Sequence, residues 1–575
     1  AAAAGACLLG TGPAAWAAVE PAPSPTVTDQ PAPAPSPSPV PTTTEEPGAG
    51  EGETTTPVPT LEPEPTPTAP EPQPSVTAEP VPEPSPESEP VVVERPATPP
   101  AASTSQIGVG QVLTALLVLA AALLVVRAVR RRAAPGGEVG APVRPGSAAP
   151  PTVRGEASPE ALVGFLVALG EAMIDSGDLV SHVTTSLEDV ARVNGSPDAQ
   201  VVVLPTALIV TIPGADTVRT AVSAAGTARL RLDQIDAVSR LTRAAERGEL
   251  DPASGLTAIR AARATEPPFG PWVQVVGYSV LTVGLALVLR AGWVDVVVAA
   301  VLGTAVGLLQ VRSHRMGPTT QVFMPVLSAF TVAVAVFLLA ARIPELEVFA
   351  PVVAPLVTFL PGALLTTAVI ELSTGQMVSG AGRLAAGGMQ LMLLAFGIVA
   401  AGQLVGVPAS TLTAATGPPL GPWTPWLGVA AFGVGVALHY GARLSFLGWI
   451  LLVLFVAYAG QVLGGLLLGG VLSAFVGALL MTPVAVFAAA QRSGPPVLVS
   501  FLPAFWLLVP GALGLVGVTQ LLSADRVDGT GSLITAAATM VGIAFGVLLG
   551  LAAGAGAVAT VGTLSARRRG ADPAA

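Results

Sequence analysis

The chain has 575 residues, of which 51% are hydrophobic and only 11% are charged, and its mean hydropathy is +0.68. A soluble protein cannot bury so much apolar surface, so the composition places the chain among membrane proteins. The single cysteine, Cys7, excludes a disulfide framework, and the absence of lysine excludes a Walker-type nucleotide site and a Schiff-base nucleophile.

The formal net charge of −10 is unevenly distributed along the chain. Residues 1–105 contain fourteen acidic residues and one arginine, whereas the remainder carries a small excess of arginine. An acidic tail ahead of a mildly basic membrane protein gives no indication of a nucleic-acid partner. The three histidines, His182, His314 and His439, are far apart in the sequence, so we expect no metal centre and no other cofactor.

The N-terminal region divides into three segments. Residues 1–19 are small and apolar, which is typical of the end of a secretory signal peptide, although an Ala-rich disordered tail is the alternative. Residues 20–105 are rich in Pro, Thr, Ser and Glu and predict a disordered extracytoplasmic stalk that could contact a cell wall; without a signal peptide they would be a cytoplasmic tail. Residues 107–126 are uncharged and long enough to form a transmembrane anchor, and the arginines that follow place its C-terminal end in the cytoplasm.

A Gly/Pro linker at 133–155 precedes a segment of ordinary composition at 156–266, which predicts a small cytoplasmic α/β domain. Its periodicity and turn signals favour helices near 159–169, 179–193, 230–247 and 253–264, with strands at 201–204 and 207–212. Two polar residues, Asp175 and His182, are candidates for a functional site in this domain. A turn with exposed side chains explains them equally well, and no G-x-S-x-G elbow or H-E-x-x-H helix accompanies them.

The rest of the chain is almost wholly apolar and predicts ten transmembrane helices in two groups of five, at 272–406 and 423–565. The short loops assigned to the cytoplasm hold eight arginines and those assigned to the outside hold three, as the positive-inside rule requires. We therefore expect a multi-pass inner-membrane protein whose soluble domain and C-terminus are cytoplasmic. The predicted spans are 272–289, 293–311, 321–341, 348–370, 384–406, 423–441, 446–462, 466–490, 497–522 and 533–561.

The two groups of helices share a sequence repeat. The segment that begins with Pro361-Gly362 aligns without gaps with the segment that begins with Pro510-Gly511, with ten identities in twenty-four positions. Because each copy has five predicted spans, the second copy enters the membrane upside down, which is the architecture of many secondary transporters. The fold class that we predict is a polytopic α-helical membrane protein with two inverted five-helix repeats.

The repeat also supplies candidate transport residues. Pro361, Gly362, Pro510 and Gly511 lie inside the fourth span of each copy and are candidate helix breaks, although an ordinary proline kink is the alternative. Glu371 is a candidate proton-titrating or substrate-orienting carboxylate, because acidic residues within membrane segments are costly and usually functional. It could equally be an end-of-helix carboxylate at the membrane interface. Its counterpart Gln520 cannot titrate, and Gln376, Gln390 and Gln403 could line a polar path.

Three stretches of this sequence resemble the threonine/serine exporter family: 161–177, 201–214, and the repeated block at 359–384 and 501–522. The resemblance covers about 156–565 and implies a ten-span carrier, not an enzyme, that exports threonine and serine with protons as the coupling ion. Some members of the family are linked to dicarboxylate export, which leaves that substrate class open. Membrane lipid and a second copy of the chain are the other partners that we expect.

Two other classes of function stay open from the sequence. In a membrane-tethered hydrolase the soluble domain would be catalytic and the spans would only anchor it, although one helix is enough for an anchor. In a structural envelope protein the stalk would hold the cell wall.

Overall fold

The computed structural model describes residues 109–132, 158–213, 218–226, 228–313, 318–407, 420–491, 493–508, 510–522 and 526–570. The predicted signal segment at 1–19, the stalk at 20–105 and the linker at 133–155 lie outside the described residues.

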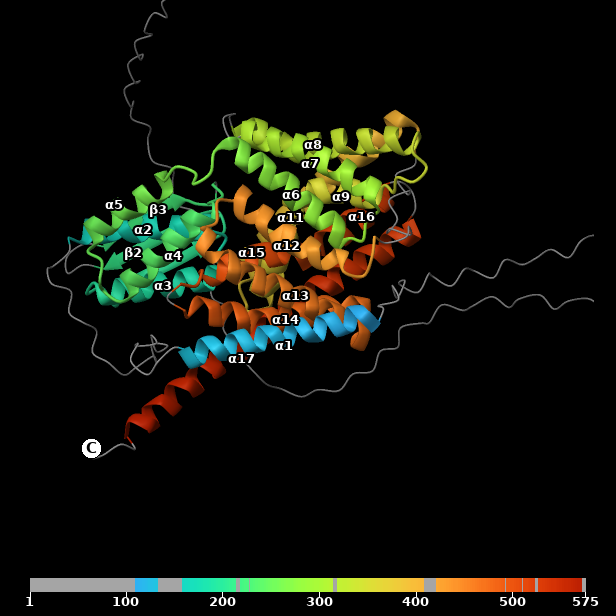
Figure 1. Cartoon of the computed structure of the whole chain (residues 1–575). Helices are drawn as coiled ribbons and strands as arrows, with labels where there is room; N and C mark the ends of the chain where they lie inside the picture. Colours follow the sequence, from blue (N-terminus) through green and yellow to red (C-terminus); the bar gives the residue numbers. More distant parts are fainter. Residues whose placement is uncertain are drawn as a thin grey trace, which may run out of the picture. The chain divides into compact units, whose positions relative to one another are not determined.

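A soluble domain of four helices and a small sheet follows the first apolar helix (Figure 1). Its first helix starts where the sequence predicts, because the Ser158 hydroxyl accepts a hydrogen bond from the main-chain nitrogen of Ala161 and Pro159 occupies the first turn. The elements are α2 (Pro159–Asp175), α3 (Val180–Val193), β1 (Gln200–Leu204), β2 (Ala207–Pro213), β3 (Val218–Ala224), α4 (Leu232–Glu246) and α5 (Pro252–Ala264).

The sheet is an antiparallel meander in the order β1-β2-β3. One face, with Val203, Leu208 and Val210, packs into a core that includes Phe165 and Leu187. The third strand was not predicted from the sequence, because its residues alternate between exposed and half-buried and none is fully buried. The domain is therefore a mixture of helices and an antiparallel sheet, without the parallel crossovers of a βαβ fold.

Seven helices in the described part of the chain are long and apolar enough to cross a membrane, and two bent helix pairs raise that number to nine if each pair is one span. The helices at Val112–Ala128 and Thr424–His439 are apolar but shorter. Ten spans plus an anchor therefore stay a prediction, whereas a multi-pass helical membrane protein is what the structure shows. The apolar elements are α1 (Val109–Arg132), α6 (Pro271–Val288), α7 (Trp293–Ser313), α8 (Pro318–Ala340), α9 (Phe349–Val353), η1 (Ala354–Phe359), α10 (Gly362–Ser373), α11 (Met377–Val405), α12 (Thr424–His439), η3 (Leu444–Phe446), α13 (Leu447–Leu468), α14 (Gly470–Ala489), α15 (Val497–Leu508), α16 (Pro510–Leu522) and α17 (Arg526–Gly570).

The predicted break at Pro361-Gly362 is a sharp bend of 59° between the α9–η1 segment and α10. Leu360, which precedes the proline, is extended with ψ near 123°, as steric contact with the proline ring requires. Helix α10 then begins at Gly362. In the second copy, α15 and α16 form the other bent pair, with an angle of 42°.

Helices of the two predicted halves pack in matching ways. In each half the third helix packs on the fifth, α8 on α11 and α14 on α17. The fourth helix of each half contacts the fifth of the other, α10 with α17 and α16 with α11, and α6 packs on α12, the first helix of the second half (Figure 1).

Glycines make the α6–α12 crossing close. Gly284 lies against Gly428, and Gly277 lies against Gly435 and Leu438, so the two helices run antiparallel through main-chain contacts. In the sequence, Gly277 and Gly284 are each 151 positions before Gly428 and Gly435, respectively.

The first prediction concerns this crossing. We expect Gly284→Ala to destabilise the folded protein by about 1–3 kcal/mol, because a Cβ atom there would clash with the main-chain nitrogen of Phe432. Gly382→Ala is the matched control: nothing lies within 4 Å of a Cβ atom at this position inside α11. Thermal unfolding of the purified full-length variants measures the difference. Equal unfolding temperatures would show that the crossing is not tightly packed.

Candidate functional site

Polar side chains from two other helices donate to main-chain carbonyls of the segment before α10. The hydroxyl of Tyr278, on α6, donates to the Pro355 carbonyl at 2.7 Å. The side-chain amide of Gln390, on α11, donates to the Phe359 carbonyl at 2.6 Å. An unsatisfied carbonyl in an apolar environment costs several kcal/mol, so these bonds stabilise the bend.

A second layer of hydrogen bonds joins these groups. The Gln310 Nε2 atom, on α7, donates to the hydroxyls of Tyr278 at 3.1 Å and Thr358 at 2.8 Å. His439 Nε2 lies 3.2 Å from Gln310 Oε1, and its ring stands edge-on to Tyr278 at a centroid distance of 4.8 Å. We call Tyr278, Gln310, Thr358, Gln390 and His439 the hinge cluster.

The hinge cluster lies inside the protein and draws on both predicted halves. Tyr278, Thr358 and His439 are 0%, 6% and 8% exposed, respectively. Four members belong to helices of the first half, and His439 is the last residue of α12 in the second. A buried polar site between two halves, beside an interrupted helix, is where secondary transporters place their substrate.

The chemistry of the hinge cluster is that of neutral hydrogen-bonding groups. It offers two hydroxyls, two side-chain amides and one imidazole, and His439 is the only member that can carry a positive charge near neutral pH. Such groups can replace the hydration of a small polar solute.

Only part of this cluster was expected from the sequence. Gln390 was expected to line a polar path, and Pro361 and Gly362 were expected to break the helix; all three lie at the bend. Tyr278, Gln310, Thr358 and His439 were missed. The signal that could have found them is the scarcity of tyrosine and histidine, with three of each in the chain, since such residues in apolar helices are seldom without a polar partner.

Glu371 lies away from the hinge cluster, at the far end of α10, and is completely buried. Ser379 donates a hydrogen bond to its carboxylate at 2.5 Å, and the Arg383 guanidinium pairs with it at 3.1 Å. Its other oxygen accepts a hydrogen bond of 3.2 Å from the main-chain nitrogen of Val180, the first residue of α3 in the soluble domain. Glu371 is thus an end-of-helix carboxylate that joins the membrane helices to the soluble domain.

The soluble domain makes contacts with both halves. Arg383, on α11, donates to the Asp178 carbonyl at 2.9 Å, beside the bond between Val180 and Glu371. On the second half, the Arg443 guanidinium lies 3.2 Å from the Asp236 carboxylate of α4. Nearby, the main-chain nitrogen of Leu232 donates to the carbonyl of Tyr440 at 3.0 Å.

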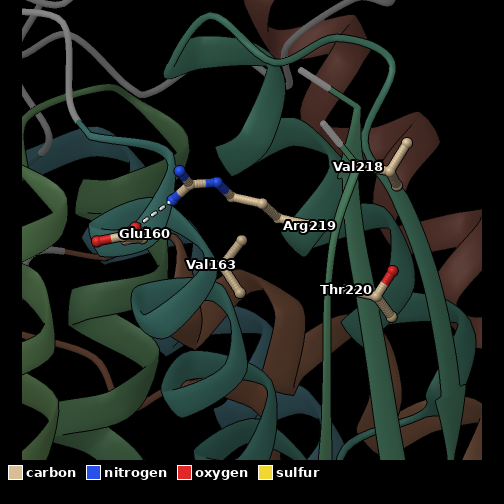
Figure 2. A pocket seen from close by; sticks show the side chains of 5 residues that line it. All are labelled: Glu160, Val163, Val218, Arg219 and Thr220. Atoms are coloured by element: carbon tan, nitrogen blue, oxygen red, sulfur yellow. Dashed lines mark ion pairs between the residues drawn. The ribbon is translucent and has the colours of Figure 1, made fainter. Parts of the chain in front are cut away.

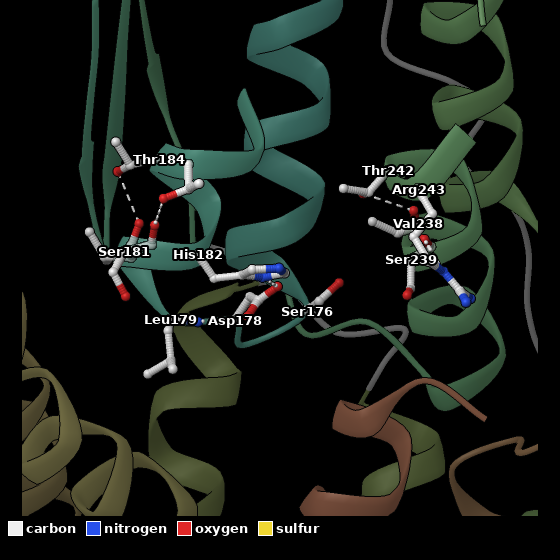
Figure 3. A network of polar contacts seen from close by, with 12 residues as sticks. Ser176, Asp178, Leu179, Ser181, His182, Thr184, Val238, Ser239, Thr242 and Arg243 are labelled. Atoms are coloured by element: carbon white, nitrogen blue, oxygen red, sulfur yellow. Dashed lines mark hydrogen bonds and ion pairs between the residues drawn. The ribbon is translucent and has the colours of Figure 1, made fainter. Parts of the chain in front are cut away.

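The two candidates in the soluble domain have separate partners. Asp175 is buried and pairs with Arg263; burial raises the pKa of this carboxyl group, and Arg263 opposes the rise. His182 pairs with Asp178 at 2.7 Å, and this hydrogen bond raises the pKa of the imidazole (Figure 3). The nearby Ser176 hydroxyl donates to the Ala172 carbonyl, so it is not aligned with His182 as a nucleophile would be.

The remaining candidates lie at the ends of helices. Gln376 is the residue before α11, and its main-chain nitrogen donates to the Glu371 carbonyl at 2.8 Å. Gln520 accepts a hydrogen bond of 2.9 Å from the Ser532 hydroxyl. Pro510 is the first residue of α16, and Gly511 follows it.

A shallow hollow of about 440 Å³ opens on the soluble domain between α2 and β3 (Figure 2). Its one carboxylate, Glu160, is paired with Arg219 at 2.7 Å and is largely exposed to solvent. The other lining residues are Val163, Val218 and Thr220. An exposed ion pair among small side chains does not provide the convergent buried groups of a binding site.

The helices and the family comparison together define a multi-pass membrane transporter of the exporter class. Residues 164–405 match a family model described as "Putative threonine/serine exporter". This segment therefore belongs to the threonine/serine exporter family, which is the family that the sequence resembles. It runs from α2 to the end of α11 and so covers most of the soluble domain and the first half. No curated protein and no solved structure matches the chain.

The second prediction concerns Glu371. We expect Glu371→Ala to release the soluble domain from the first half, because it leaves Arg383 buried without its anionic partner, a change that costs about 3–5 kcal/mol in proteins. Amide hydrogen exchange at 176–183 in the full-length protein would rise. The control is Ser532→Ala, which breaks the corresponding contact with Gln520 in the second half. Unchanged exchange in Glu371→Ala would contradict the assignment.

The third prediction concerns pH. The folded protein raises the pKa of His182 above its ordinary value of 6.5, so the stabilisation from the Asp178 contact is fully present below pH 6.5 and is lost as the pH rises through the folded pKa. Because the His182 side chain is 57% exposed, we expect a small effect confined to the start of α3. Hydrogen exchange there should quicken with pH beyond its intrinsic rate, and His182→Gln should abolish that excess.

Proposed function

We propose that this protein is a secondary exporter of threonine, serine or similar small hydrophilic metabolites across the inner membrane, driven by the proton-motive force. The observation that carries the proposal is the hinge cluster, a buried set of neutral polar groups around a broken helix in a segment of this family. In this proposal the cluster binds the substrate, and the bend opens toward one side of the membrane at a time.

The packing supports two halves related by an inverted two-fold axis. Gly277 and Gly428 are equivalent positions in the two copies, and so are Gly284 and Gly435. In the structure Gly284 contacts Gly428 and Gly277 contacts Gly435, as expected when a two-fold axis relates two antiparallel helices. Elsewhere, a Cβ atom at Gly380 would meet Leu372, and one at Gly529 would meet Leu521. These positions are also equivalent in the sequence repeat.

The charge of the hinge cluster favours an amino acid over a dicarboxylate. A dicarboxylate would need cationic side chains to replace its hydration, and the cluster has no arginine or lysine. Arg383, a buried arginine of the same half, is already paired with Glu371. A zwitterion with a hydroxyl group carries no net charge and suits neutral donors and acceptors.

The other assignments follow from this proposal. Pro361-Gly362 and Pro510-Gly511 are the two hinges, and the soluble domain is the cytoplasmic gate or regulator. Coupling roles for Glu371, Gln376 and Gln520 stay predictions, as do contact of the stalk with a cell wall and assembly into a homo-oligomer.

The fourth prediction tests transport itself. Proteoliposomes that contain the full-length protein and are preloaded with radiolabelled threonine should release it faster when a pH gradient is imposed, and an uncoupler should abolish the acceleration. Gln390→Leu should slow release, since it leaves the Phe359 carbonyl unsatisfied at the bend. Met389→Leu, an exposed position next to Gln390 on the same helix, is the control.

If the wild-type protein moves neither threonine nor serine under any gradient, the substrate assignment is wrong and dicarboxylates are tested next. If it moves none of these solutes, the transport proposal is overturned.

A further inference from the structure

His439 has two hydrogen-bond acceptors, one for each nitrogen of its ring. Nδ1 lies 3.0 Å from the main-chain carbonyl of Gln274, and Nε2 lies 3.2 Å from the side-chain oxygen of Gln310. A carbonyl oxygen can only accept, so both contacts are hydrogen bonds at the same time only when both ring nitrogens carry a hydrogen. An imidazole that donates from both nitrogens is the protonated, positively charged form.

The same residues offer a second arrangement for the neutral ring. A side-chain amide can turn by 180° and exchange its oxygen for its NH₂ group, whereas the Gln274 main-chain carbonyl cannot change its role. With Gln310 turned, its NH₂ group donates to an unprotonated Nε2 and its oxygen faces the hydroxyls of Tyr278 and Thr358. Each hydroxyl can donate or accept, so Thr358 can reverse its bond to suit either orientation.

We propose that His439 is the coupling-proton site of this exporter: Nε2 binds one proton, and Gln310 transmits the change of charge to the bent helix. The reaction is the binding of a proton to the lone pair of Nε2, and the proton leaves on the opposite side of the membrane. This inference rests on the proposed transport function and names the residue that links transport to the proton gradient.

The position of His439 suits this role. It comes from α12 in the second half, whereas Gln310, Tyr278 and Thr358 belong to the first half, so the bond between His439 and Gln310 crosses between the two halves. Burial penalises the charged ring, but the C-terminal end of a helix accommodates a cation, and His439 is the last residue of α12.

The titratable and charged groups around His439 include Arg229, whose charge acts on Tyr440, and Asp233, which lies beside Gly441. Tyr278 of α6 and Tyr440, which follows His439, have their rings 4.8 Å from it. Of the other helices that pack on α12, α15 carries no titratable side chain, and α13 carries Tyr458, whose ring lies against Trp426 near the opposite end of α12. Arg443, just beyond α12, pairs with Asp236. Glu371 is paired with Arg383 at the far end of α10.

A direct test follows the protonation of the ring without any transport. The chain has three histidines, so the full-length His182→Gln/His314→Gln variant leaves His439 as the only one. Nitrogen-15 NMR of this variant in lipid nanodiscs should show the imidazole passing from charged to neutral between about pH 5 and pH 9. A ring that keeps one protonation state across this range would overturn the proposal, whether or not the protein transports threonine.

The second test separates coupling from transport. In proteoliposomes with an acidic lumen, a one-unit pH gradient can drive up to about tenfold threonine accumulation for each proton exchanged. We expect His439→Gln to show no accumulation above the external concentration, yet to exchange internal for external threonine at a rate that no longer depends on pH. His182→Gln, in the soluble domain, is the control and should accumulate threonine as the wild type does.

Two results would count against the inference in different ways. Accumulation by His439→Gln at the wild-type level overturns it and leaves the transport proposal standing. Loss of accumulation in Glu371→Gln but not in His439→Gln moves the proton to Glu371. If His439→Gln does not fold, Gln310→Leu replaces it, because loss of the amide that transmits the change should also remove pH-driven accumulation.

Discussion

The structure depends on one constraint: a helix interrupted among apolar side chains must find hydrogen-bond partners for its freed main-chain groups. Pro361 cannot continue the preceding helix, and the carbonyls of Pro355 and Phe359 before the bend face side-chain donors. Tyr278 and Gln390 supply donors, and these polar side chains must themselves be satisfied, which brings in Gln310. The polar interior of this membrane protein is therefore a consequence of the bend, and it is also what a polar solute would need.

The two predicted halves differ where the soluble domain touches them. Glu371 and Arg383 occupy the repeat positions of Gln520 and Ser532, and both pairs are in contact. The neutral pair of the second half needs no further partner. The charged pair of the first half also binds the start of α3 in the soluble domain, through the main-chain nitrogen of Val180. Binding of the soluble domain to the first half therefore explains why the first copy has a charged pair where the second has a neutral one. This explanation does not require Glu371 to bind or release a proton.

The sequence predicted what depends on local patterns and missed what depends on distant contacts. Long apolar runs and the Pro361-Gly362 pair sufficed to place the bend and most helix ends within a few residues, because chain length and proline chemistry act locally. Helices α11 and α17, however, each begin seven residues before the predicted span. The hinge cluster brings Tyr278 to His439, 161 positions apart, and each alone resembles an ordinary helix residue. Strand β3 was missed because its alternation gives little apolar signal. Glu371 was singled out from the sequence as a candidate transport residue, whereas its contact with Val180 of the soluble domain has no sequence signature.

The contacts of the soluble domain also suggest an order of events in the proposed cycle. A rigid domain bound to both halves must release one of them if the halves rock against each other. The contact with the second half includes the Arg443–Asp236 ion pair, in which the Arg443 side chain is 53% exposed, and the main-chain hydrogen bond from Leu232 to Tyr440. An ion pair open to solvent contributes about 0–1 kcal/mol and a hydrogen bond about 0.5–1.5 kcal/mol. The contact with the first half relies on the buried Glu371–Arg383 ion pair, and disrupting such a pair costs about 3–5 kcal/mol. The second half should therefore separate first, and the soluble domain should move with the half that carries the bend at Pro361.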